Sequence, residues 1–245
     1  MKERDISLLP LTDDQLLVVA CDSCGGVGNK RDDAVKVDPE TVGYYTCRVA
    51  LMEVMAVGAA VRLVVDTLAV EWEPSGQRIY AGIQRAMSEA KLSMDAINGS
   101  TEENFPMSQT AMGITVVGTV HPDGYRSAFS KPGDQLVVAG IPKVGKEIRH
   151  PTDRDVIAMD DFMKLRNHPA VKDMIPVGSS GIRSETMLIS RLNQLSVNWL
   201  GTHGLDLDKS AGPATCLVAA VDPRGISELK NRLKAPLTVV ALLEK

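Results

Sequence analysis

Apolar residues recur along this chain at two spacings, one typical of strands and one typical of helices. Residues 16–21 form an apolar run of the strand type. Asp38 then stands where it would cap a helix that starts at Pro39, because its carboxylate can accept hydrogen bonds from free backbone amides. The apolar residues that follow are spaced to share one helix face: Tyr45, Val49, Met52 and Ala56. We therefore predict a strand and then a helix that ends near Gly58.

The rest of the chain continues this alternation. Up to residue 130 we predict a strand at 61–70, a helix at 76–92, a short strand at 94–97, and a hairpin of 112–121 and 125–129. Beyond it we predict strands at 135–139, 215–221 and 237–243, and helices at 154–166, 183–197 and 223–233. Strands that alternate with helices in both halves indicate an α+β architecture of two domains. The turn at 131–134 is the expected boundary, which gives domains of residues 1–130 and 131–245.

The composition is that of an ordinary globular protein, since 44% of the 245 residues are hydrophobic and 24% are charged. A net charge of −4 without a basic run argues against nucleic acid as the partner. No apolar run approaches the roughly 20 residues of a membrane span, and the first residues lack the pattern of a signal peptide. The four cysteines do not indicate a disulfide framework in a chain of this length. We expect a cytoplasmic enzyme that acts on a small molecule.

Residues 22–30, Asp-Ser-Cys-Gly-Gly-Val-Gly-Asn-Lys, carry the clearest chemical signal. Glycines allow close backbone approach, so amides of this loop would face an anion at Gly25, Gly26 and Gly28. Lys30 supplies a mobile cation, and Asp22 is suited to hold the Mg²⁺ that accompanies a nucleotide. The alternative is a glycine-rich turn with a solvated lysine. The segment thus predicts polyphosphate binding, with that alternative open.

Three further acids are candidates for the same site. Glu53 lies on the flank of the apolar stripe of the first helix, and Glu102 and Glu103 follow the short strand at 94–97. A charge beside a core is costly unless it is paired or bound to a metal, and nucleotide-bound Mg²⁺ takes carboxylates from separate elements. The alternative for Glu53 is a surface residue whose aliphatic stem covers apolar atoms.

Two other patterns do not predict a site of a known kind. Cys21 and Cys24 form a C-x-x-C, but there is no second pair for zinc, and a glycine loop follows where a redox site would have a helix. We expect bystander thiols. Residues 140–147 nearly spell a P-loop, but Glu147 takes the place of the required hydroxyl. A phosphate-contacting loop of another kind remains open there.

Taken together, these segments resemble the superfamily of aminoimidazole ribonucleotide synthetase and thiamine-monophosphate kinase. Asp22 with residues 26–30 resembles the family's Asp-Gly-Val-Gly-Thr-Lys, with a short insertion and Asn29 for Thr. Glu53 stands where the family has a metal-binding aspartate. Residues 98–103, Asn-Gly-Ser-Thr-Glu-Glu, correspond to its Gly-Gly-Glu/Asp-Thr. Ser100 therefore replaces a carboxylate, and Glu102 or Glu103 would compensate.

The second half carries weaker likenesses. Residues 131–134 resemble the turn before the family's C-terminal domain, residues 176–182 resemble its Asp-x-Ser-Asp-Gly-Leu helix entry without the acids, and 215–243 resemble its closing strand–helix–strand. The resemblance implies a two-domain PurM-like architecture. An N-terminal domain of sheet and helices would bind ATP and Mg²⁺ and pair into a homodimer through its sheet, and an α/β sandwich domain would follow.

The resemblance also implies roles for individual residues. Asp22, Lys30 and Glu53 would be catalytic, and Mg²⁺ would be held by Asp22, Glu53, Glu102 and Glu103. ATP would be bound by Gly25, Gly26, Gly28, Asn29, Lys30, Gly99, Ser100 and Thr101.

Within the superfamily, residues 21–30 and 42–53 are most similar to the short α-ribazole kinases. The implied activity is phosphorylation of the 5′-hydroxyl of α-ribazole to α-ribazole 5′-phosphate, for assembly of the lower ligand of cobamides. The alternatives are another ATP-dependent enzyme of this fold, either like thiamine-monophosphate kinase or like the aminoimidazole ribonucleotide synthetase ligase, and a non-catalytic nucleotide-binding module.

Overall fold

The computed structural model describes residues 2–148 and 153–245. The chain divides into two compact units, one of residues 1–55 and 59–124 and one of residues 56–58 and 125–245. The roles assigned above to residues 1–130 and 131–245 stay predictions. Among the described residues, no helix has the length and apolar character needed to cross a membrane.

The first unit is built on a six-stranded sheet in the order β1-β2-β3-β8-β6-β7. Its strands are β1 (Lys2–Glu3), β2 (Ile6–Thr12), β3 (Gln15–Gly25), β6 (Ala60–Leu68), β7 (Ile97–Thr101) and β8 (Ala111–Val120). Only β6 and β7 pair in parallel, and the other neighbours are antiparallel. A short parallel pair, β4 (Val27–Gly28) and β5 (Val35–Lys36), forms in the connection after β3.

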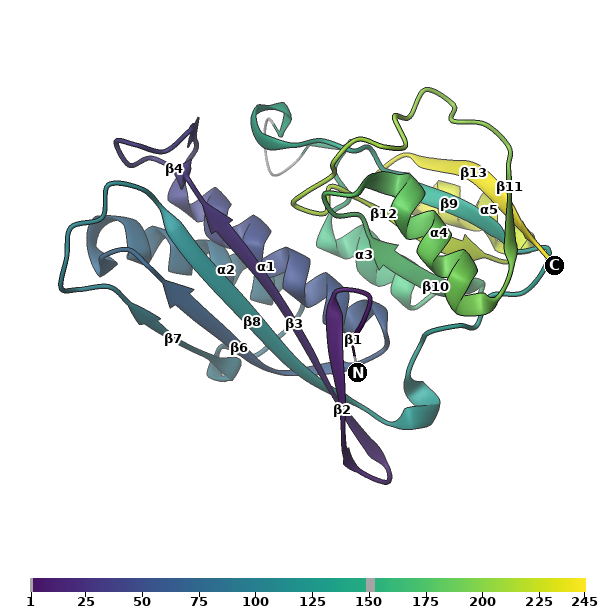
Figure 1. Ribbon diagram of the computed structural model, residues 1–245, viewed down its shortest axis with the longest axis horizontal. Helices are drawn as coiled ribbons and strands as arrows, with labels where there is room; N and C mark the ends of the chain where they lie inside the picture. The colour runs from purple at the N-terminus through teal and green to yellow at the C-terminus, as the bar shows by residue number, and fades with distance from the viewer. Residues whose placement is uncertain (1, 149–152) are drawn as a thin grey trace. The chain divides into compact units, whose positions relative to one another are not determined.

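Two helices, α1 (Pro39–Ala56) and α2 (Gln77–Glu89), lie along one face of this sheet, behind it in Figure 1. They cross closely at two glycines. A Cβ on Gly43 would lie 1.9 Å from the carbonyl oxygen of Ile79, and one on Gly82 would lie 1.9 Å from that of Glu40. Short helical turns, η1 (Trp72–Gly76), η2 (Met94–Ala96) and η3 (Pro122–Gly124), complete the unit.

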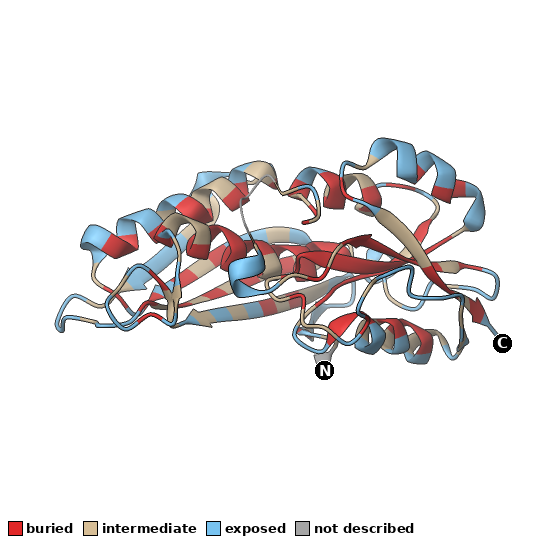
Figure 2. Ribbon diagram, turned by 90° about the horizontal axis from the view of Figure 1, so that it is seen from above, coloured by how far each residue is buried: buried red, intermediate tan, exposed pale blue. Residues whose placement is uncertain are grey.

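The strands of the first sheet have two unlike faces. Along β8, buried residues such as Ile114 and Val116 alternate with half-buried ones such as Val117, and Figure 2 shows this banding in the ribbon. The buried set faces α1 and α2. The other face carries apolar side chains without a helix over them, and Leu63 of β6 is 38% exposed there.

The second unit has a five-stranded antiparallel sheet in the order β10-β12-β9-β13-β11. Its strands are β9 (Gln135–Gly140), β10 (Val171–Pro176), β11 (Ser196–Trp199), β12 (Cys216–Val221) and β13 (Leu237–Glu244). Its helices are α3 (Met159–Arg166), α4 (Gly181–Asn193) and α5 (Pro223–Arg232), with a short turn η4 (Gly145–Glu147). Helix α4 packs across β10, β11 and β12, and its Ile182 and Ile189 join one buried cluster with alternate residues of the sheet.

Most predicted elements are confirmed, including the Asp38 cap, whose carboxylate accepts from the amide of Glu40 at 2.9 Å. Three assignments are wrong. Residues 125–129 form no strand, because the amides of Phe129 and Ser130 donate to the carboxylate of Asp173 instead of to a strand. The helix predicted to reach 197 ends at Asn193, since Gln194 is left-handed with φ 55°. The strand expected at 94–97 is a 3-10 turn, η2, and the strand β7 begins only after it. Two strands, β2 and β10, were not predicted from the sequence.

Candidate functional site

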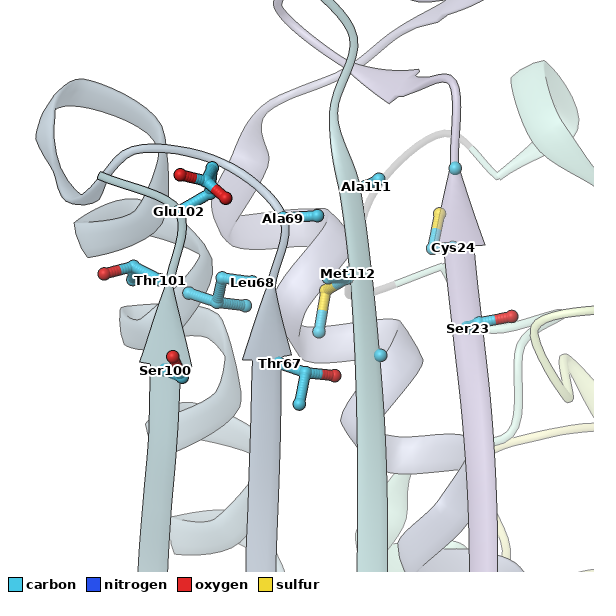
Figure 3. Close-up of a pocket in the computed structure, with 12 residues that line it drawn as sticks. Ser23, Cys24, Thr67, Leu68, Ala69, Ser100, Thr101, Glu102, Ala111 and Met112 are labelled. Atoms are coloured by element: carbon cyan, nitrogen blue, oxygen red, sulfur yellow. The ribbon is translucent and has the colours of Figure 1, made fainter. Parts of the chain in front are cut away.

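A hollow of about 610 Å³ opens at one end of the first sheet. It lies where β3, β6 and β7 end and β8 begins, so four neighbouring strands contribute to its wall (Figure 3). Hydroxyl side chains line it from three strands: Ser23, Thr67, Ser100 and Thr101. Apolar atoms of Leu68 and Met112 and the carboxylate of Glu102 lie between them.

The lining suits hydrogen bonding to an anion but does not supply positive charge. None of the lining residues, all of which the structure describes, is lysine or arginine. A polyphosphate bound here would need its charge balanced by a metal ion or by cations from the surrounding loops. Of the residues predicted from the sequence, the hollow includes Gly25, Ser100, Thr101 and Glu102.

Behind this lining, the carboxylates of Asp22 and Asp66 lie in the same row of side chains across the sheet. Asp22 and Asp66 both pair with Ile114 of β8, one from β3 and the other from β6. One step nearer the hollow on the same face, Cys24 and Leu68 flank Met112 in the same way. Strand alternation therefore points both aspartates toward the helix-covered face, in the row directly behind the pocket wall. Asp22 lies within β3, which continues to Gly25, and not in the loop that the sequence suggested.

Asp66 is the more unusual of the two. It is 3% exposed, and its Oδ2 atom is buried with no hydrogen-bond partner. Burial raises its pKa to about 6, although a hydrogen bond from the amide of Ser100 acts in the opposite direction. A Cβ on Gly99 would lie 1.9 Å from Asp66 Oδ1, so only glycine leaves room for this carboxylate. Burial also raises the pKa of Asp22, with a smaller contribution from Asp5.

The acids predicted to hold Mg²⁺ are not gathered in one place. Glu53 is buried and pairs with Arg4 at 3.4 Å between Oε2 and Nη2. Glu103 accepts from the amide of Trp72 at 3.0 Å and from the hydroxyl of Thr101 at 2.8 Å. Within residues 2–148 and 153–245, no group of three or more His, Cys, Asp or Glu side chains could hold a metal ion.

The remaining member of that set, Glu102, accepts from the amide of Asn104 at 2.7 Å. The structure thus does not bring Asp22, Glu53, Glu102 and Glu103 together, whereas Asp22 shares its row of the sheet with Asp66. A cation there would be held by one or two carboxylates and would complete its shell with water and phosphate oxygens, which is the usual way in which Mg²⁺ binds nucleotides. The orphaned Asp66 oxygen fits that arrangement.

Lys30 is held by the protein and is not a mobile cation. Its ammonium lies 2.5 and 2.7 Å from the two carboxylate oxygens of Glu71 and 3.0 Å from the carbonyl oxygen of Met107. Its side chain is 12% exposed. Sequence reasoning missed Glu71, because the pair joins loops that lie far apart along the chain.

The glycine loop itself is folded around Asp33, which is 6% exposed. The Asp33 carboxylate accepts from the amide of Lys30 and from the amide and hydroxyl of Thr110, each at 2.8 Å. Burial opposes the ionisation of Asp33, but these hydrogen bonds lower its pKa overall. A Cβ on Gly28 would lie 2.2 Å from Thr110 Oγ1, and the amide of Gly26 donates to the carbonyl of Thr110.

Of the loop amides expected to face an anion, that of Gly26 is therefore used within the protein, as is the amide of Lys30 in the same loop. Asn29 lies exposed in the same loop.

The other two patterns contain no activated group. Cys21 and Cys24 are free thiols, and burial raises the pKa of Cys24, so this thiol is not activated. Residues 145–147 form a short 3-10 turn where a P-loop would begin a helix, and Glu147 pairs with Lys209 at 2.8 Å. The rejection of a P-loop at this position is confirmed.

Comparison with known proteins agrees with this architecture. Residues 3–120 match the family model of the AIR synthase related protein, N-terminal domain. The structure is similar to thiamine monophosphate kinase from Aquifex aeolicus, with a TM-score of 0.67, 14% identity, and coverage of 100% of this chain and 90% of that one. A comparison with curated protein sequences finds no match.

Two ligand complexes are also similar. AaThiL complexed with AMPPCP and TMP has a TM-score of 0.64 at 15% identity, over 98% of this chain and 84% of that one. T. maritima PurL complexed with ATP has a TM-score of 0.64 at 15% identity, over 98% of this chain and 42% of that one. These likenesses confirm the PurM-like fold, and the domain match supports the superfamily expected from the sequence.

Proposed function

We propose that this protein is an ATP-dependent enzyme that binds the triphosphate at the hollow of the first sheet and transfers its terminal phosphoryl group to a small-molecule alcohol. The observation that carries the proposal is the orphaned Asp66 carboxylate in the row behind a hydroxyl-lined hollow. Leaving a buried carboxylate oxygen unpaired is costly unless a ligand or metal satisfies it. Similar structures, AaThiL with AMPPCP and T. maritima PurL with ATP, contain nucleotides of the proposed class.

Asp66 would hold the Mg²⁺ of Mg-ATP, and Asp22, on the far side of Ile114, would act on it through the water shell of the ion. The metal, when bound, would neutralise charge on the phosphates and raise the electrophilicity of the terminal phosphorus. The hydroxyls of Ser23, Thr67 and Ser100 line the hollow from the opposite face of the sheet, so they would contact a part of the ligand that lies away from the metal. Such positioning and charge compensation supply most of the catalysis in phosphoryl transfer, which leaves the protein little covalent work.

In the transfer step the acceptor oxygen forms a bond to the γ-phosphorus, while the bond from that phosphorus to the β–γ bridging oxygen breaks. ADP leaves with the electron pair of that bond, and the acceptor hydroxyl releases its proton to water. A strong general base is not required for a loose transition state of this kind. The site can therefore function without a histidine or a free carboxylate next to the acceptor.

We propose α-ribazole as the acceptor, phosphorylated at its 5′-hydroxyl. This part rests on the similarity of residues 21–30 and 42–53 to the short α-ribazole kinases. A thiamine-monophosphate kinase-like activity, a ligase of the same fold and a non-catalytic nucleotide-binding module are the competing outcomes of the test below. We further propose a homodimer formed through the helix-free face of the first sheet.

The test is a turnover assay with Mg-ATP and a panel of α-ribazole, thiamine monophosphate and unrelated nucleosides, in which ADP and phosphorylated product are measured by mass spectrometry. We expect product only with α-ribazole. Product only with thiamine monophosphate would reassign the acceptor, and nucleotide binding without turnover would favour the binding module. The Asp66→Asn protein, purified in the same way, controls for contaminating kinases.

A further inference from the structure

The ammonium of Lys30 has three N–H donors, and each has a protein acceptor. Two bonds go to the carboxylate oxygens of Glu71, at 2.5 and 2.7 Å, and one goes to the carbonyl of Met107, at 3.0 Å. The side chains of Lys30 and Glu71 are 12% and 23% exposed. Burial alone would raise the pKa of Glu71, but its hydrogen bond from Lys30 and further bonds lower it overall. Glu71 is therefore an ionised carboxylate bound to a cation whose three donors are all used by Glu71 and Met107.

The three segments that meet at this cation also border the hollow. Lys30 follows Gly25, and Glu71 follows Leu68 and Ala69 after β6. Met107 lies in the connection that runs from Glu102 to Ala111, both of which line the hollow. The backbone next to Glu71 is held separately, because the amide of Trp72 donates to Glu103. The Glu71 side chain can therefore leave Lys30 without unfolding this loop, although residues 70–76 then lose one of their ties to the rest of the unit.

We propose that Glu71 is an internal anion at a phosphate position, and that a phosphate group of the bound polyphosphate displaces it from Lys30. This inference rests on the proposed function. A carboxylate and a phosphate present the same kind of oxygen acceptors to an ammonium. Each bound phosphate thus competes with Glu71, so Glu71 lowers the affinity of the site for polyphosphate. The competing explanation is that the ion pair of Lys30 and Glu71 only stabilises the contact between two loops.

The two explanations predict opposite effects of removing the Glu71 charge. In Glu71→Gln, Lys30 no longer has a charged partner to give up, so we expect the dissociation constants of Mg-ATP and of inorganic tripolyphosphate to fall roughly five- to tenfold. In Lys30→Met both constants should rise, and adding Glu71→Gln to Lys30→Met should bring no recovery. Isothermal titration calorimetry measures all four proteins.

Asp32→Asn is the matched control, because it also removes one carboxylate near Lys30. Asp32 lies in the glycine loop, pairs with Arg31 and makes no bond to the Lys30 ammonium. Its affinities should equal those of the wild type. Weaker or unchanged binding by Glu71→Gln would show that the ion pair of Lys30 and Glu71 is only structural, and would overturn the inference. Equal tightening by Asp32→Asn and Glu71→Gln would also overturn it, since a general field effect would then explain both. Wild-type protein that binds neither ligand would overturn the proposed function, and this inference with it.

A measurement on the wild type does not depend on the folding of any variant. Hydrogen exchange followed by mass spectrometry, with and without tripolyphosphate, reports on residues 70–76 and on the glycine loop. Displacement of Glu71 predicts slower exchange in the glycine loop and faster exchange in residues 70–76. Slower or unchanged exchange in residues 70–76 on binding would contradict the displacement.

Discussion

Asp22 and Asp66 flank Ile114 on the covered face of the first sheet, one on each side, although the two lie on strands separated in the sequence by the whole of α1. Two strand spacings of about 4.8 Å separate their backbones by roughly 10 Å. Burial raises the pKa of both carboxylates, which is the environment expected of acids that gain their charge partner from a ligand. The pair therefore places two acids one row behind the wall of the hollow, an arrangement that no single segment of the sequence displays.

We expect Asp66→Asn and Asp22→Asn each to lower kcat/KM for Mg-ATP by at least about a hundredfold, the scale of losing one electrostatic partner in the transition state. The reason is that each substitution removes a negative charge that would hold the metal on the triphosphate. Steady-state kinetics with Mg-ATP as the varied substrate provides the measurement. Asp123→Asn is the control, because Asp123 is exposed in η3. Rates within tenfold of wild type for both variants would remove these aspartates from the site.

The pKa of Asp66, raised to about 6, predicts a pH-dependent cost to stability. Between about pH 4 and pH 6 the folded protein keeps a proton on Asp66 that the unfolded chain has lost, so rising pH destabilises the wild type in this window. Asp66→Asn removes this pH-dependent decrease in the free energy of unfolding, because asparagine does not ionise. Its free energy of unfolding should therefore improve relative to wild type as the pH rises, by up to about 3 kcal/mol.

Urea denaturation of both proteins from pH 4.5 to pH 7.5, without divalent cations, measures this difference. A difference in unfolding free energy that stays constant across the range would mean that Asp66 ionises normally. Added Mg²⁺ should stabilise the wild type more than Asp66→Asn at the upper end of the range, because only the wild type offers the charged carboxylate.

The sequence predicted the elements that depend on local signals. The Asp38 cap and Pro39 are local signals, and both were identified correctly. The single apolar stripe expected on α1 is wrong, because this helix is buried on nearly all sides and Val49 is only half-buried. The face of a strand that becomes buried depends on its pairing. Asp66 is visible in the sequence as an acid within residues 60–68, but its inward direction follows from the register of β6 against β8. This explains why the sequence analysis selected Glu53, which is paired with Arg4, and missed Asp66.

Contacts between loops were equally beyond local reasoning. Lys30 was expected to be a mobile cation of the glycine loop, whereas Glu71 and Met107 reach it from two other connections. The strand predicted at 125–129 failed for a related reason. Asp173 lies far along the chain, yet its buried carboxylate takes the amides of Phe129 and Ser130.

The fold of the glycine loop should depend on Asp33. Asp33→Asn replaces a charged acceptor of three hydrogen bonds from Lys30 and Thr110 with a neutral amide. We expect a loss of about 1–3 kcal/mol in local stability, seen as faster hydrogen exchange in residues 26–37. Gly28→Ala should have a similar effect, because its Cβ would meet Thr110 Oγ1 at 2.2 Å. Asp32→Asn is the control, and equal exchange in all four proteins would show that Asp33 does not organise the loop.

The helix-free face of the first sheet should be the dimer contact. Leu63 of β6, in the middle of this face, is 38% exposed. It pairs with Val117 of β8, and Val117 pairs on its other side with Val19 of β3. Apolar side chains gathered on an open sheet face are a typical contact surface. Light scattering coupled to gel filtration should give a dimer for the wild type and a monomer for Leu63→Glu, because the glutamate would bury an unpaired charge. Leu200→Glu alters a side chain that is 48% exposed in the second unit and should leave the dimer intact. A monomeric wild type, or dissociation by Leu200→Glu alone, would place the contact elsewhere.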